Sequence, residues 1–67
     1  MKNILKYRME RGLSQMQLGK KSGVSQGYIS DLERGEKQPT VSVAKKIATA
    51  LGVSITVLLD DSTIEST

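Results

Sequence analysis

The chain has 67 residues, a net charge of +3, and neither cysteine nor histidine. It is long enough for one small domain, but it lacks disulfides, the best zinc ligands, the thiol nucleophile and the commonest general base. We therefore expect no enzymatic activity, no cofactor and no metal site. No apolar run is long enough to cross a membrane, and the N-terminal MKNILKYRMERG has no signal-peptide pattern, so we expect a soluble, cytoplasmic protein.

The charge is unevenly distributed along the chain. Residues 1–59 contain all ten Lys and Arg but only four of the seven acids, so they carry +6, whereas DDSTIEST at residues 60–67 carries −3. A basic body is typical of proteins that bind a polyanion, although a well-solvated surface has the same composition. We expect one domain over residues 1–60 and a short, disordered acidic tail over residues 61–67.

Helix start and stop signals predict five helices, over residues 2–11, 14–21, 25–34, 40–51 and 54–60. The second begins at Ser14, whose hydroxyl can accept a hydrogen bond from a free backbone N–H of the first turn. Gln17 completes a Ser-x-x-Gln capping box, and Leu13 and Leu18 form a hydrophobic staple around it. The same cap and staple recur at two later helix starts, Val24-Ser25 with Ile29 and Val53-Ser54 with Leu58.

The remaining signals complete an all-α pattern. Thr40, after Pro39, is the expected cap of the fourth helix. A glycine that can adopt a left-handed conformation follows each of the first four helices, at Gly12, Gly23, Gly35 and Gly52. No alternating strand pattern competes with the helices.

The turn between the second and third helices is the most informative element. At most four loop residues, 22–25, join the two helices, and so short a turn forces a steep crossing, as in a helix-turn-helix. The crossing needs a small residue where the backbones approach, and Gly19 stands there. The apolar residues that then face a common core are Leu18, Val24, Ile29 and Leu32. A simple αα-hairpin is the alternative interpretation.

Together these features resemble the lambda repressor/Cro-type helix-turn-helix domains, also called the xenobiotic-response-element family. The matching stretches, within about residues 4–59, are Leu13-Ser14-Gln15 with Leu18, Gly23-Val24-Ser25, Ile29-Ser30 with Leu32-Glu33-Arg34-Gly35, Pro39-Thr40, and Ile47-Ala48 through Ala50-Leu51-Gly52-Val53-Ser54. The resemblance implies a compact five-helix domain that binds double-stranded DNA, usually as a dimer on palindromic sites. Two positions depart from the family pattern. Gly19 replaces the usual Ala, at a cost of about 0.5–1 kcal/mol in helix stability, and Gly27 replaces a longer polar side chain.

One face of the third helix is expected to read DNA bases. Ile29 and Leu32 mark its buried stripe, and its N-terminal residues can enter the major groove. The candidates for base contact lie opposite this stripe or beside that face: Ser25, Gln26, Gly27, Ser30 and Asp31. Gln26 can pair bidentately with adenine. Asp31 would be repelled by phosphates, unless it accepts a hydrogen bond from a cytosine amine or is neutralised by Arg34.

The candidates for phosphate contact are Gln15, Tyr28, Arg34, Lys37 and Gln38. Gln15 opens the second helix, where free N–H groups can meet a phosphate. For Arg34, Lys37 and Gln38 the family resemblance implies contact with the DNA backbone just after the third helix. Tyr28, at the edge of the buried stripe, either packs its ring into the core or reaches a phosphate through its hydroxyl.

The resemblance also implies a structural ion pair and a dimer surface. The ion pair joins Arg8 in the first helix to Glu33 near the end of the third, and breaking a partly buried pair typically costs about 3–5 kcal/mol. The expected dimer surface is the fifth helix, SITVLLD, which has more apolar residues than one face can bury: Ile55, Val57 and Leu59. A single exposed apolar residue, Val57, is the alternative.

We therefore expect a sequence-specific double-stranded DNA-binding regulator, a repressor that binds a palindromic operator as a homodimer. The alternative is a protein-interaction module such as an antitoxin, although the chain has no long toxin-binding extension. A binder of single-stranded RNA would need exposed aromatic residues for stacking, and this chain has only Tyr7 and Tyr28.

Overall fold

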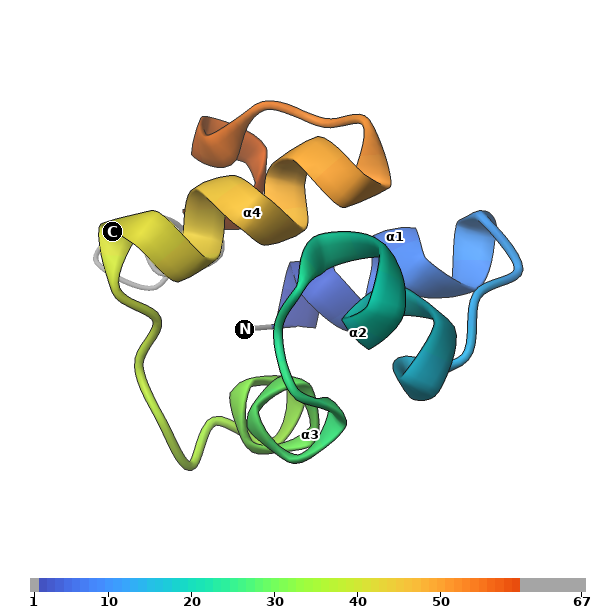
Figure 1. Cartoon of the computed structure of the whole chain (residues 1–67). Helices are drawn as coiled ribbons and strands as arrows, with labels where there is room; N and C mark the ends of the chain where they lie inside the picture. Colours follow the sequence, from blue (N-terminus) through green and yellow to red (C-terminus); the bar gives the residue numbers. More distant parts are fainter. Residues whose placement is uncertain (1, 60–67) are drawn as a thin grey trace.

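This computed structural model describes residues 2–59 of the chain. They contain four helices and one shorter helical segment, joined by turns. The helices are α1 (Lys2–Glu10), α2 (Gln15–Ser22), α3 (Gln26–Arg34) and α4 (Val41–Leu51), and residues 55–59 form the fifth (Figure 1). No strand occurs within residues 2–59. The prediction of an all-α, five-helix fold is confirmed, and each helix begins within one residue of its predicted start.

The predicted end of the fifth helix at residue 60 and the predicted acidic tail over residues 61–67 lie outside the described residues. Among residues 2–59, no helix is both long and apolar enough to cross a membrane. The same residues contain no group of three or more carboxylate, imidazole or thiol side chains placed to hold a metal ion.

The helix starts follow the predicted caps. The Ser14 hydroxyl accepts a hydrogen bond from the Gln17 N–H at 3.0 Å, and the Gln17 side chain accepts one from the Ser14 N–H at 2.8 Å, which completes the capping box. Single hydroxyl caps start the later helices: the Ser25 hydroxyl accepts from the Tyr28 N–H, the Thr40 hydroxyl from the Val43 N–H, and the Ser54 hydroxyl from the Val57 N–H. These local hydrogen bonds fix where each helix begins.

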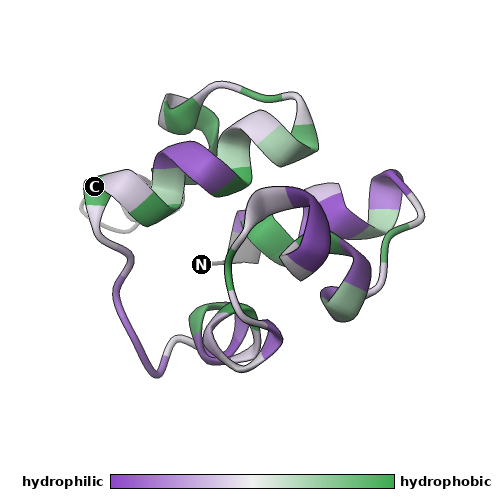
Figure 2. Ribbon diagram, in the orientation of Figure 1, coloured by the Kyte–Doolittle hydropathy of each residue, from purple (hydrophilic) through white to green (hydrophobic). Residues whose placement is uncertain are grey.

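A single apolar core joins all five helical segments. Its fully buried side chains are Ile4, Leu18, Ile29, Leu32, Ile47, Leu51 and Leu58. Figure 2 shows hydrophobic and hydrophilic residues alternating in bands along the ribbons, as expected of helices that bury one side only. No polar or charged residue among those described is fully buried. The core therefore places the polar sides of the helices at the surface.

The steep crossing of α2 and α3 depends on Gly19. This residue is buried, and a Cβ atom added to it would lie 2.8 Å from the Val24 carbonyl oxygen and 3.5 Å from the Gln26 nitrogen. Because the nearest of these atoms belongs to the backbone, it cannot turn aside as a flexible side chain would. Glycine at this position therefore costs helix stability, but it permits the close approach that sets the direction of α3.

Candidate nucleic-acid interface

The free face of α3 is the main candidate surface. Ile29 and Leu32 are completely buried, whereas Gln26, Gly27 and Arg34 are exposed on the same helix. In Figure 1, α3 lies at the lower edge of the molecule, with the other helices above it. The buried stripe turns toward those helices, so the opposite face remains open to a ligand.

The N-terminal end of this face carries polar groups that can still form hydrogen bonds with a ligand. Ser25 is exposed, and its hydroxyl oxygen accepts the cap hydrogen bond from the Tyr28 N–H at 3.2 Å, so its hydrogen remains available for donation. The Gln26 side chain is exposed and has no hydrogen-bond partner among residues 2–59. At Gly27 an added Cβ would meet nothing within 4 Å. Ser30 lies one turn further along and is partly exposed.

Asp31 is paired with two cations, one at the end of α3 and one in the segment that follows it. Its Oδ1 atom lies 2.7 Å from an Arg34 guanidinium nitrogen, and its Oδ2 atom lies 3.4 Å from Lys37 Nζ. Arg34 also lies 3.4 Å from the Glu36 carboxylate. This arrangement corresponds to the alternative in which Arg34 neutralises Asp31, with Lys37 as a second cation that the sequence interpretation did not include.

Tyr28 connects α3 to the segment that follows it. Its ring packs against the core, and its hydroxyl donates a hydrogen bond to the Gln38 carbonyl at 3.2 Å. Lys37 Nζ lies 5.6 Å from the centre of the same ring, within the range of a cation–π contact. The ring is thus packed and the hydroxyl is bonded to the chain itself, while a contact of that hydroxyl with a DNA phosphate stays a prediction.

Glu33 forms the centre of a partly buried network on the other side of α3. Arg8 donates to both carboxylate oxygens, from Nε at 2.7 Å and from Nη2 at 3.1 Å, while its Nη1 donates to the Leu13 carbonyl at 2.8 Å. Gln15 Nε2 donates to the same carboxylate at 2.9 Å. The Arg8 and Glu33 side chains are only 13% and 6% exposed, so the pair is well shielded from water.

These contacts affect the ionisation of both partners. Burial raises the pKa of the Glu33 carboxyl, but hydrogen bonds from Arg8 and Gln15 and the charge of Arg8 outweigh it, so the pKa lies below its ordinary value. The hydrogen bond to Glu33 raises the pKa of Arg8. The same hydrogen bond to Glu33 holds the side chain of Gln15, a candidate phosphate contact, at the first turn of α2.

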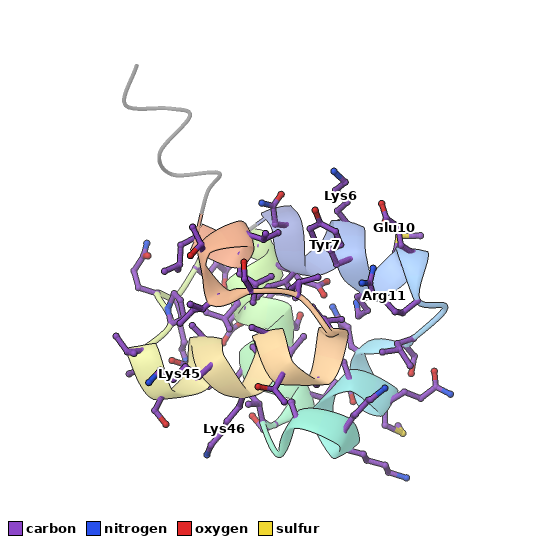
Figure 3. The ribbon with its side chains drawn as sticks, turned by 90° about the horizontal axis from the view of Figure 1, so that it is seen from above. Lys6, Tyr7, Glu10, Arg11, Lys45 and Lys46 are labelled. Atoms are coloured by element: carbon purple, nitrogen blue, oxygen red, sulfur yellow. The ribbon has the colours of Figure 1, made fainter. Side chains whose placement is uncertain are left out.

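Two contacts, one made by α1 and one by the turn that follows it, were missed by the sequence analysis. Arg11 donates from Nε to the Leu51 carbonyl at the end of α4, at 2.7 Å, and Asn3 donates to the Val57 carbonyl at 2.6 Å. Two cations, Lys6 and Arg11, lie over the Tyr7 ring at 5.2 and 5.4 Å from its centre. Figure 3 shows this group on α1 and the turn after it, seen from the side away from α3, with Lys45 and Lys46 separate on α4.

The candidate dimer residues differ in exposure. Leu58 is completely buried, Ile55 and Val57 are partly buried, and Leu59 is 42% exposed. Ile55 packs against the core. Leu59 is therefore the residue of this segment that offers most apolar surface to a partner.

The crossing of α2 and α3 through a short turn, with the polar face of α3 left open, defines a helix-turn-helix domain. A sequence model described as Helix-turn-helix matches residues 4–58. The chain therefore belongs to this family, in its Cro/C1-type, lambda repressor-like branch.

Several relatives carry names of regulators. The chain is 48% identical over 52 residues to an "Uncharacterized HTH-type transcriptional regulator y4dJ" of Sinorhizobium fredii, a match that covers 78% of this chain and 68% of the relative. It is 34% identical over 61 residues to the immunity repressor of Bacillus phage phi105, covering 91% and 42% of the two chains. It is 37% identical over 59 residues to the regulator SinR of Bacillus subtilis, covering 87% and 53%. The chain thus spans about half of the last two relatives.

Solved structures have the same fold. The restriction-modification controller protein C.AhdI of Aeromonas hydrophila superposes with a TM-score of 0.82 at 32% identity, covering 85% of this chain and 86% of that one. SinR in its complex with SinI superposes with a TM-score of 0.86 at 35% identity, covering 91% and 60%.

Proposed function

We propose that this domain binds double-stranded DNA in a sequence-specific manner and regulates transcription, acting as a repressor. The observation that carries the proposal is the open face of α3, with the unpartnered Gln26 at its N-terminal end and the cations Arg34 and Lys37 at its C-terminal end. Family membership supports it, since relatives are named as an immunity repressor and as transcriptional regulators.

In this mode of binding, α3 enters the major groove and its N-terminal residues meet base edges. Gln26 pairs with adenine through its amide, and Ser25 and Ser30 donate or accept hydrogen bonds nearby. Gly27 leaves room for close approach of the DNA. The phosphates are bound by the start of α2 at Gln15 and by the segment after α3, through the residues Arg34, Lys37 and Gln38.

The domain works as a homodimer on a palindromic operator, in the cytoplasm. One recognition helix covers only a few base pairs, so useful specificity requires two half-sites about one DNA turn apart. The proposed contact lies on residues 55–59, through Leu59 with Val57 and Ile55 at its edge. The partial exposure of this segment supports the assignment.

Selection of binding sites from random double-stranded DNA tests the function. The expected result is enrichment of an inverted repeat whose half-sites are separated by about 10 base pairs, one turn of the duplex. Failure to enrich any sequence, together with no retention of native upstream DNA in a gel shift, would contradict the proposal and favour the protein-interaction module.

A further inference from the structure

Asp31 occupies an unfavourable position for a residue of a DNA-binding face. It lies in the middle of α3, on the side opposite the buried Ile29 and Leu32. A negative charge there is repelled by the phosphates of an approaching duplex. The contacts that Asp31 makes within the protein, with Arg34 and Lys37, indicate its role.

Those contacts are with two of the residues proposed to bind phosphate. Arg34 and Lys37 lie 2.7 and 3.4 Å from the two different oxygens of the Asp31 carboxylate. The Asp31 side chain is 22% exposed, whereas those of Arg34 and Lys37 are 58% and 60% exposed. The carboxylate is thus more shielded from water than either of its two cations.

Tyr28 restrains the same segment from a second direction. Its hydroxyl bonds the Gln38 carbonyl at 3.2 Å, and its ring lies 5.6 Å from Lys37 Nζ. The segment after α3 is therefore held against the helix in the absence of DNA, with both cations already paired to a carboxylate.

We infer that Asp31 acts as an internal substitute for a DNA phosphate and lowers the affinity of the domain for every DNA sequence. This inference rests on the proposed DNA-binding function. A carboxylate and a phosphate offer similar acceptor oxygens to Arg and Lys. When DNA binds, Arg34 and Lys37 each give up the Asp31 carboxylate for a phosphate. The lost ion pairs offset part of the attraction between these cations and DNA. The Asp31 charge is then left unpaired, facing the duplex.

Salt dependence provides an independent signature. Neutralising phosphates releases counterions from DNA, which makes the observed affinity fall as salt rises. In the wild type, the Asp31 carboxylate that loses its cations takes up a counterion from solution and offsets part of this release. Removing the carboxylate abolishes the offset and steepens the salt dependence.

The experiment compares Asp31→Asn with Glu10→Gln, which has the same change in net charge. Glu10 lies on α1 and pairs only with Arg11, at 3.5 Å, among the described residues. Each protein is titrated with a random-sequence duplex and with the selected site at several salt concentrations. We expect Asp31→Asn to tighten binding to both duplexes by the same factor, about three- to tenfold, and to steepen the salt slope by up to about one unit. Glu10→Gln should change affinity by less than about twofold.

A further comparison tests whether Asp31 acts through its partners. In a protein that carries Lys37→Ala, Asp31→Asn should have a smaller effect on affinity than in the wild type. Thermal melts confirm that each variant folds, and Asp31→Ala serves as a second variant because Ala suits a helix.

The alternatives give different results. Weaker binding to all sequences would mean that Asp31 positions the cations for contact with DNA, and weaker binding to the selected site alone would mean that it reads a cytosine. Either result, or equal effects of Asp31→Asn and Glu10→Gln, would overturn the inference while leaving the DNA-binding function intact. A wild-type protein that binds neither duplex would instead contradict the function itself.

Discussion

Gln26 and Lys37 are proposed to make two different kinds of contact with DNA. A side chain that bonds a base edge distinguishes between sequences, whereas one that bonds a phosphate does not. Both side chains are exposed in the structure, so replacing either one should leave the core unchanged.

We predict that Gln26→Ala loses about 1–3 kcal/mol of binding free energy on the preferred site and relaxes the preference at one base pair in each half-site. Lys37→Ala should weaken binding to all sequences alike and reduce the salt slope by about one unit. Site selection with each variant, combined with salt titrations, measures both effects. An unchanged site preference for Gln26→Ala would show that another residue reads that base.

Glu33 gives a prediction about pH. Because the pKa of Glu33 is lower in the folded protein than its ordinary value, the ionised carboxylate stabilises the fold above the unfolded pKa, about 4.3. This contribution is lost as the pH falls below that value through the folded pKa. Glu33→Gln removes the charge at every pH and leaves Arg8 without its partner, at a cost of about 3 kcal/mol at neutral pH.

Urea unfolding of the wild type and Glu33→Gln at pH 7 and at pH 3 measures this effect. The difference in stability between the two proteins should be large at pH 7 and smaller at pH 3. A difference that stays constant over this range would mean that the Glu33 charge does not contribute to stability.

The α2–α3 crossing has no room for a Cβ at Gly19, whereas Gly27, within α3, faces open space. Helix propensity alone favours Ala over Gly by about 1 kcal/mol at both positions. The two glycines have the same helix propensity but differ in the space available for a side chain.

We predict opposite effects of the same substitution. Gly19→Ala should destabilise the domain by about 1–3 kcal/mol, because the Val24 carbonyl would have to move. Gly27→Ala should stabilise it by about 0.5–1 kcal/mol, through the gain in helix propensity. Thermal melts of the two variants measure the change in stability. A stabilising Gly19→Ala would mean that α2 and α3 can move apart at that point without loss of stability.

Local sequence predicted the helices better than it predicted the contacts between them. The caps at Ser14, Ser25 and Thr40 involve neighbours in the chain, so their pattern was visible in the sequence. The bond from Arg11 to the Leu51 carbonyl joins residues 40 positions apart, and no local pattern specifies such a pairing.

The candidate interface divides in the same way. The open face of α3 followed from helical periodicity, and Arg34 lies three residues after Asp31, a spacing that sequence reveals. The contact of Lys37 with Asp31 and the bond from Tyr28 to Gln38 depend on how the chain folds back after Gly35. Such contacts could not be derived before the path of that segment was known.

The proposed homodimer makes a prediction about how two copies of the domain bind DNA together. Leu59 is the best residue with which to test it, because Val57 is partly buried and its carbonyl accepts the bond from Asn3. A charged residue at position 57 could disturb the fold, whereas Leu59 is 42% exposed.

We predict that Leu59→Glu abolishes cooperative filling of a palindrome but preserves binding to a single half-site, because a buried unpaired charge at an interface is costly. Met9→Glu is the matched control, since Met9 is 66% exposed near the opposite end of α1 from Asn3. Sedimentation and half-site titrations measure the two properties. Cooperative filling by Leu59→Glu would place the dimer contact on another surface.

The bonds from Asn3 to Val57 and from Arg11 to Leu51 also have a consequence for synthesis of the protein on the ribosome. Asn3 in the first helix and Arg11 in the turn after it find these polar partners 54 and 40 residues later along the chain. Ile4 is buried in a core that includes Leu58, so α1 cannot complete its packing on a nascent chain that ends before that residue. The core is therefore expected to close only after the residues through Leu58 have left the ribosome, because the contacts that close it join distant parts of the chain.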